Sequence, residues 1–404
     1  MNTRCRTTCL VACLGVSLIA NCARAAEGFE AYVDPIRGND NNSGTKSSPL
    51  KTVSAAIEKV PELVAAAISV HLAPGVYKTT GAKGMPASLL ILDRKMRREG
   101  DNRIDISVHI IGEGRNFEGA AKPGEVILDW GTGLQIQVDN GIWNLENVQI
   151  GNRSYKGTQQ GIIVSGSSSL VHLRNVRIRT TSLSGCGIGA IRGGEVQLHG
   201  RIELNEDLHD QAPENSFCGI SASYNGTVRW NDSSGVLSMG NGSLSAGYFG
   251  VIELGCKTAR ITSWGRQSNN LAINDSGRID LHGTETTLCS KHKENTLIGL
   301  EDDGHILAEG AKIILETEPD FPGYIVLQKA STLYVGTFII HGNSGVNFSA
   351  SSGSSLMGAV EGKVGQVGAE TGSYIALWCS QKPESINESK HGMVDIQVAP
   401  AVGR

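Results

Sequence analysis

A turn glycine followed by alternating apolar residues recurs along the second half of this 404-residue chain. The peptides at 194–200 (Gly-Glu-Val-Gln-Leu-His-Gly) and 277–283 (Gly-Arg-Ile-Asp-Leu-His-Gly) are nearly the same. Gly141, Gly226 and Gly304 open comparable segments, each after a residue that favours turns. We expect each of these glycines to adopt a positive φ between two strands, so the chain is constrained to a repeating β architecture.

A second alternating strand precedes most of the turn glycines. Its apolar pairs are Ile188 and Ala190, Ile220 and Ala222, Ile252 and Leu254, Leu271 and Ile273, and Ile298 and Leu300. The strands are predicted to start near 186, 218, 249, 270, 296, 324 and 347, in steps of 21 to 32 residues. Such steps fit coils with variable loops, whereas the alternative β-sandwich would show regular hairpins. The sequence therefore predicts an all-β parallel β-helix of roughly nine to eleven rungs.

Composition agrees with this fold and narrows the partners. The chain has 40% hydrophobic residues, enough for a large core, and 51 glycines with only 5% aromatic residues, which favours many short strands. The formal net charge of −4 gives no basic field. Nucleic acid is therefore not an expected partner.

The first 25 residues have the pattern of a secretion signal. Arg4 and Arg6 precede an apolar run from Cys9 to Ala20, and small residues flank a cleavage site after Ala25. The alternative is a membrane anchor, but the run is shorter than the roughly 20 residues that span a bilayer, and no other candidate span follows. We expect a secreted or periplasmic protein.

The mature chain, residues 26–404, is predicted to form one β-helix domain. Residues 26–70 would supply an N-terminal strand and a short amphipathic helix that caps the open end of the core. Residues 71–360 would form the rungs, and residues 361–404 the last rung and a C-terminal tail.

The N-terminal segment carries a family resemblance. Its peptides include Tyr32-Val33-Asp34-Pro35, the Gly/Asn/Asp loop 38–45, the segment 48–53 and the segment 71–77. This pattern, over roughly residues 31–130, resembles the start of pectin-lyase-like proteins, which include pectate lyases, pectin methylesterases and tailspike-like proteins. The resemblance implies a right-handed parallel β-helix and a polysaccharide or cell-surface glycan as partner.

The catalytic signatures of those families are missing from the chain. There is no Gln-Asp-Thr-Leu or Asp-Phe-x-x-Gly run of the methylesterases, and no Asn-Thr-Asp or Arg-Ile-Lys signature of the polygalacturonases. The resemblance thus leaves two functions open. One is binding of an acidic polysaccharide, with or without its modification by a lyase, esterase or hydrolase activity. The other is a noncatalytic surface or tailspike-like interaction module.

Two acidic groups are candidate catalytic sites. The long insertion at 203–217 contains Asp207, His209 and Asp210, which suit calcium binding or acid and base catalysis on a sugar, or alternatively form a solvated loop. Asp302 and Asp303, with Asp275 at the matching place of the preceding rung, are predicted to form an acidic ledge. The alternative for the ledge is ordinary turn chemistry, since Asp is common before a turn glycine.

Arginines on one strand are candidate ligand-binding residues. In the run 176–179, alternation buries Val176 and Ile178 and points Arg177 and Arg179 outward. Such arginines could grip the carboxylate or sulfate groups of an acidic glycan. The alternative is that they are solubilising surface charges.

Cysteine usage predicts one possible bridge and no zinc site. Five cysteines remain after signal removal, and Cys186 and Cys218 occupy the same place in successive rungs. Strands of neighbouring rungs lie about 4.8 Å apart, within reach of a disulfide, so these two residues are expected to form either a bridge or a reduced ladder pair. No spacing indicates a structural metal, calcium remains possible, and the sequence predicts no particular oligomer.

Overall fold

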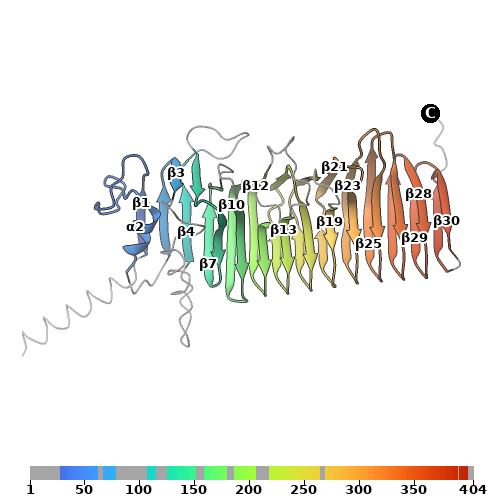
Figure 1. Ribbon diagram of the computed structural model, residues 1–404, viewed down its shortest axis with the longest axis horizontal. Helices are drawn as coiled ribbons and strands as arrows, with labels where there is room; N and C mark the ends of the chain where they lie inside the picture. Colours follow the sequence, from blue (N-terminus) through green and yellow to red (C-terminus); the bar gives the residue numbers. More distant parts are fainter. Residues whose placement is uncertain are drawn as a thin grey trace, which may run out of the picture.

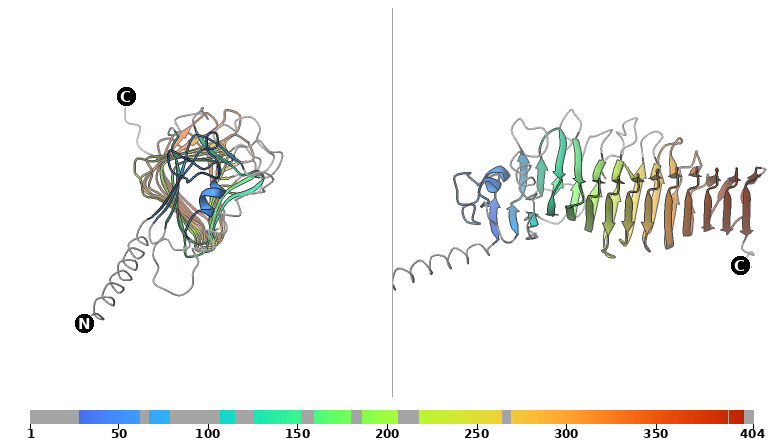
Figure 2. Two further views of the ribbon diagram at one scale, coloured as in Figure 1. Left: turned by 90° about the vertical axis from the view of Figure 1, so that its left-hand side faces the viewer. Right: turned by 90° about the horizontal axis from the view of Figure 1, so that it is seen from below.

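The computed structural model describes residues 28–61, 67–78, 107–114, 125–151, 159–179, 186–205, 218–263, 269–389 and 391–398. These residues form an all-β structure with 31 strands and one short helix, α2 (Val53–Glu58). The strands stack along a rod, from the N-terminal end in blue to the C-terminal end in red (Figure 1). Seen along the rod, the coils superimpose around a common core (Figure 2). Among these residues no helix is long and apolar enough to cross a membrane.

The strands form three parallel columns. The chain passes through the columns in turn as it completes each coil. The first column is an 11-stranded sheet. Its strands in spatial order are β6 (Gly133–Val138), β9 (Gln159–Ser165), β11 (Cys186–Ile191), β13 (Cys218–Ser223), β16 (Ser243–Gly247), β19 (Asn269–Ile273), β22 (Thr296–Leu300), β24 (Gly323–Leu327), β26 (Val346–Ala350), β28 (Val364–Ala369) and β30 (Ser385–Glu388).

The second and third columns belong to one larger sheet, because several long strands run through both. Strands of the second column alone are β1 (Phe29–Val33), β2 (Ile68–Leu72), β4 (Ser107–Gly112), β7 (Gly141–Glu146), β14 (Thr227–Trp230), β17 (Val251–Leu254) and β20 (Arg278–Leu281). Strands of the third column alone are β3 (Gly75–Lys78), β5 (Val126–Asp129), β8 (Gln149–Ile150), β15 (Val236–Met239), β18 (Thr258–Ser263) and β21 (Glu285–Ser290). The remaining strands are β10 (Ser169–Ile178), β12 (Glu195–Leu204), β23 (His305–Glu316), β25 (Thr332–His341), β27 (Ser355–Glu361), β29 (Tyr374–Cys379) and β31 (Met393–Val398).

Strand positions in the first column match six of the seven predicted starts to within one residue. The seventh, near residue 249, is wrong: β16 (Ser243–Gly247) fills that place, with Leu244 stacked between Ile220 and Leu271. Ile252 instead lies in the second column, on β17, paired in register with Val228 of β14. The misassignment arose because β15 to β17 follow one another closely, so alternation alone did not separate the columns.

Most of the turn glycines play a different role from the predicted one. Gly141 does have a positive φ, but in the turns before Gly226 and Gly304 the left-handed conformation falls on the two preceding residues. A Cβ added to Gly226 would lie 2.0 Å from the carbonyl oxygen of Ala190 in the preceding coil. Gly226 is therefore required by close backbone contact between coils, and Gly304 by the Ile273 side chain 2.8 Å from an added Cβ. The sequence pattern does not distinguish these roles from a positive φ.

The two ends of the core are finished differently. At the N-terminal end α2 buries Val53, Ala56 and Ile57, and the hydroxyl of Thr52 accepts a hydrogen bond from the N–H of Ala55 at 3.1 Å. This confirms the expected cap helix. At the C-terminal end β31 continues the stack on β29.

Candidate functional site

A row of left-handed turns connects the first column to the second in successive coils. Each turn has two consecutive residues with positive φ. The pairs are Arg192-Gly193, Tyr224-Asn225, Tyr248-Phe249, Asp275-Ser276, Asp302-Asp303, Lys329-Ala330, Ser352-Gly353 and Thr371-Gly372. From Gly193 onward the N–H of the second residue donates to the carbonyl of the first residue one coil further along, as in Asn225 to Tyr248 at 3.1 Å. We call this row the turn ridge.

Several turn-ridge residues are poorly suited to their backbone conformation. A left-handed residue costs an ordinary L-amino acid about 1–2 kcal/mol, whereas Asn and Asp tolerate it. Asp302 and Asp303, at φ of 50° and 62°, fit this preference. Tyr248 and Phe249, at 49° and 62°, do not. Bulky residues at such positions point to a role other than folding.

The aromatic part of the turn ridge is open to solvent. Tyr224 and Tyr248 stack with ring centroids 4.6 Å apart and an interplanar angle of 2°. Their exposed fractions are 53% and 44%, and that of Phe249 is 65%. The carboxylate of Asp275, and then Tyr224, raise the pKa of the Tyr248 hydroxyl. Three exposed rings thus lie next to a carboxylate in neighbouring coils.

The acidic part of the turn ridge lies on the turns of the next two coils. The hydrogen bond from the N–H of Ser276 to the carbonyl of Asp302 places Asp275 and Asp302 at the same position of neighbouring turns, as predicted for the acidic ledge. The carboxylate of Asp302 lies 3.0 Å from the ammonium of Lys329. Asp303 lies 3.4 Å from Nε2 of His305. The ledge therefore continues the aromatic part and ends at a lysine.

Arg177 is not the surface residue that the sequence predicted. The alternation is confirmed, since Val176 and Ile178 face the core, but Arg177 is itself only 3% exposed. Its Nε donates to Glu203 at 2.7 Å and one terminal nitrogen donates to both oxygens of Glu125 at 3.1 Å. These carboxylates come from other coils and hold Arg177 in a buried cluster, so it is not available to grip a glycan.

The other predicted residues are placed as follows. Arg179 is half-buried at the end of β10. Asp207, His209 and Asp210 lie outside the described residues, so their role stays a prediction. Cys186 and Cys218 are paired in register on β11 and β13, which confirms that they are stacked neighbours. The side chain of Cys218 is not among those described, so the bridge stays a prediction.

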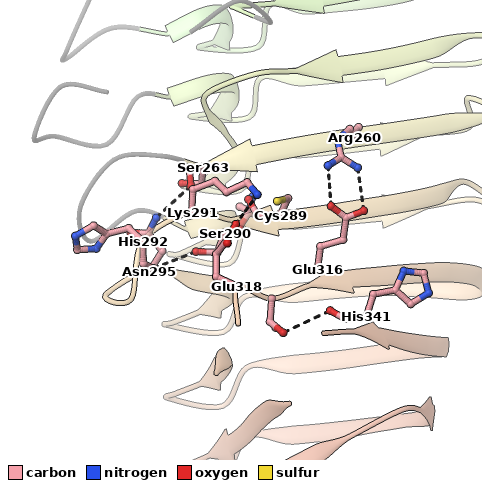
Figure 3. A network of polar contacts seen from close by, with 12 residues as sticks. Arg260, Ser263, Cys289, Ser290, Lys291, His292, Asn295, Glu316, Glu318 and His341 are labelled. Atoms are coloured by element: carbon pink, nitrogen blue, oxygen red, sulfur yellow. Dashed lines mark hydrogen bonds and ion pairs between the residues drawn. The ribbon is translucent and has the colours of Figure 1, made fainter. Parts of the chain in front are cut away.

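A second polar network joins β18, β21 and β23 and was not predicted. Arg260 donates to both carboxylate oxygens of Glu316, at 3.1 and 2.7 Å, and Lys291 pairs with Glu318 at 2.5 Å (Figure 3). Cys289 lies between these pairs, and burial raises the pKa of its thiol. A protonated thiol is a poor nucleophile, so this network ties coils together rather than forming a reactive site.

Two histidines meet on the second column. Nδ1 of His172 lies 3.3 Å from Nε2 of His199, and the rings stack. Burial lowers the pKa of both imidazoles. Within the described part of the chain no three His, Cys, Asp or Glu side chains gather into a metal site. A shallow depression of about 400 Å³ lies further along the rod, between Lys312 and Glu361.

Comparison with known proteins gives a partial family match and distant structural likenesses. Residues 36–189 match the model of a family described as "Protein of unknown function (DUF1565)". No curated protein matches. The chain is similar to the crystal structure of GH136 lacto-N-biosidase from Eubacterium ramulus, at 12% identity and a TM-score of 0.36, over 92% of this chain and 68% of that one. Its selenomethionine derivative gives 11% and 0.34 over the same shares.

Proposed function

We propose that this chain is an exported glycan-binding protein that holds a saccharide against the turn ridge. The observation that carries the proposal is the stacked, exposed pair Tyr224 and Tyr248 beside Phe249. Flat aromatic faces suit the C–H face of a pyranose ring, because they bury apolar area and present negative charge to the C–H groups. Nothing in the packing of the core requires three exposed rings there.

The neighbouring polar groups suit the hydroxyls of such a sugar. Asp275 follows the rings, Asn225 shares a turn with Tyr224, and Asp302 comes one coil later. Carboxylates accept hydrogen bonds from hydroxyls, and an amide can both donate and accept. Because like charges repel, the carboxylate of Asp275 beside the rings favours a neutral glycan over the acidic polysaccharide expected from the sequence.

Binding without turnover is the function that the site supports best. The ledge carboxylates of Asp302 and Asp303 are engaged by Lys329 and His305. The sequence also lacks the catalytic signatures of the families that it resembles. An enzymatic activity would instead be expected to involve the segment 206–217, which contains Asp207, His209 and Asp210.

The proposal includes the exported form of the protein. We infer that residues 1–25 are removed after Ala25, and that residues 26–404 form one right-handed helix of roughly nine to eleven rungs. Unbroken parallel pairing from β1 to β31 supports a single solenoid. The general right-handedness of parallel crossovers supports its hand.

The test is binding of purified residues 26–404 to immobilised neutral glycans, with pectin, alginate and a glycosaminoglycan as acidic counterparts. The double variant Tyr224→Ala/Tyr248→Ala is expected to bind about tenfold more weakly, since two rings contribute roughly 1 kcal/mol or more. Tyr334→Ala, which removes an exposed ring on β25, is the matched control. Retention that the double variant leaves unchanged, or retention of acidic glycans only, would refute the proposal. Released sugar would instead show an enzyme.

A further inference from the structure

The outer edge of β31 is an exposed strand edge. Tyr374 to Cys379 of β29 pair with the inner side of β31, and no described strand pairs with its outer side. Met393 donates its N–H to Ser373, so alternate residues, from Val394 on, direct their N–H and C=O groups to the outer edge. In Figure 1 this end of the rod carries no counterpart of α2 in the described residues.

This edge has few of the usual devices against pairing. Exposed strand edges are generally protected by lysine, proline or bulges. The strand Met393–Val398 has neither lysine nor proline and a single charge, Asp395. Met393 and Val398 are 62% and 46% exposed. The edge is therefore a template for another strand.

The sequence of β31 is complementary to itself in an antiparallel arrangement centred on Ile396. Register with β29 places Val394, Ile396 and Val398 above the buried row of the preceding coil. A twofold axis at Ile396 pairs Ile396 with its own copy and Val394 with Val398. All three residues present their N–H and C=O groups at this edge. Each of these pairs therefore falls on a hydrogen-bonded position of the antiparallel ladder.

The outward side chains are complementary in the same register. Asp395 would lie opposite Gln397 of the second copy rather than opposite another Asp395. The amide oxygen of Gln397 already accepts a hydrogen bond from Nε1 of Trp378 at 3.0 Å, so its NH₂ can donate to the facing carboxylate. Glu388 now accepts from the N–H of Val394 at 3.0 Å and would be displaced by the carbonyl of Val398.

We propose that two copies of this chain associate end to end through antiparallel pairing of β31. A strand that pairs with its own copy across a twofold axis must be antiparallel, and the interface is then closed. The product is a rod of twice the length with two turn ridges. Joined binding surfaces increase avidity for a repeating ligand, although the association itself does not depend on the proposed glycan site.

Opposite substitutions at one exposed position test the register. Sedimentation velocity of residues 26–404 from about 1 to 100 μM should show a monomer–dimer equilibrium, a range that detects interfaces of ordinary strength. Gln397→Lys would face Asp395 and should tighten the dimer about threefold to tenfold, whereas Gln397→Glu should weaken it by a similar factor. Both variants lose the same amide, so each controls for the other.

Two results would overturn the proposal. A monomer over the whole range would do so, as would a dimer on which the two Gln397 variants act in the same direction. Deletion of residues 399–404 that converts a monomer into a dimer would show that the tail covers the edge. Ile396→Lys should abolish the dimer, and a melting curve on that variant separates lost pairing from lost folding.

Discussion

The turn ridge and the Arg177 cluster both consist of side chains that point away from the core, yet one is open and the other is buried. Tyr248 and Phe249 are exposed, whereas Arg177 and Glu203 are 3% and 2% exposed. The difference does not come from direction, because both sets leave the coil outward. The Arg177 side chain is instead engaged by Glu125, 52 residues earlier, and Glu203, 26 residues later, which are themselves buried.

The Arg177 cluster and the turn-ridge aromatics play different roles in the molecule. A buried charge without its counter-charge is strongly unfavourable, so the members of the Arg177 cluster depend on one another. The turn-ridge aromatics contact each other and are exposed to solvent, and their backbone conformation is strained. We therefore expect substitutions in the cluster to change stability, and substitutions on the turn ridge to change binding.

The largest expected effect is that of Arg177→Ala. It leaves Glu125 buried without a counter-charge and Glu203 with Arg201 alone, and should lower the free energy of unfolding by about 3–5 kcal/mol. Arg229→Ala is the control, because Arg229 makes a similar pair of contacts, with Glu195 and Glu253, from a side chain that is 41% exposed.

Arg229→Ala should lower the free energy of unfolding by no more than about 1 kcal/mol. Both variants are compared by chemical denaturation at neutral pH. Equal losses for the two substitutions would show that burial does not separate the cluster from ordinary surface ion pairs.

Gly226→Ala should have the next largest effect. Its Cβ would meet the backbone of Ala190 at 2.0 Å, and relieving that contact should cost about 1–3 kcal/mol. Gly283→Ala serves as the control, because Gly283 has a φ of 66° with no atom within 4 Å of an added Cβ. It isolates the cost of the left-handed conformation, about 1 kcal/mol. A smaller loss for Gly226→Ala than for the control would contradict the close-contact role.

These two sites also show how far the sequence predicts the structure. Local periodicity predicted two strands per coil, most strand starts of the first column, the cap helix and the inward placement of Val176 and Ile178. It did not predict the burial of Arg177, because the covering carboxylates are distant in the chain. Nor did it reveal the turn-ridge aromatics, since Tyr248 and Phe249 lack the turn preference that marked Asp302 and Asp303. A strand start was predicted near residue 249, so nothing in the pattern marked Tyr248 and Phe249 as turn residues.

A smaller effect concerns His172, which is half-buried beside His199. Burial, and then the charge of His199 and Arg174, lower the pKa of His172 below its ordinary value. The unfolded chain therefore binds more protons than the folded chain just below pH 6.5, so the free energy of unfolding should fall as the pH drops through that range.

His172→Gln should flatten this dependence, measured as the difference in unfolding free energy between pH 7.5 and pH 5.5. His282→Gln is the control, because the His282 side chain is 65% exposed. If His172→Gln leaves the pH dependence of the unfolding free energy unchanged, another group causes the loss of stability at low pH.

The smallest effect on stability, and the sharpest on function, is expected for Tyr248→Asn. Asparagine tolerates the left-handed conformation that Tyr248 adopts at a φ of 49°, so the substitution should leave stability unchanged or raise it by about 0.5 kcal/mol. The same substitution removes one ring of the stacked pair and should weaken glycan retention several-fold. Asp303→Asn, at a position already suited to its backbone, should change neither quantity.

A protein that becomes more stable as it loses its ligand would show that the strain at Tyr248 serves binding. If stability falls together with retention, Tyr248 instead supports the turn, and the distinction between the turn ridge and the Arg177 cluster fails at its central residue.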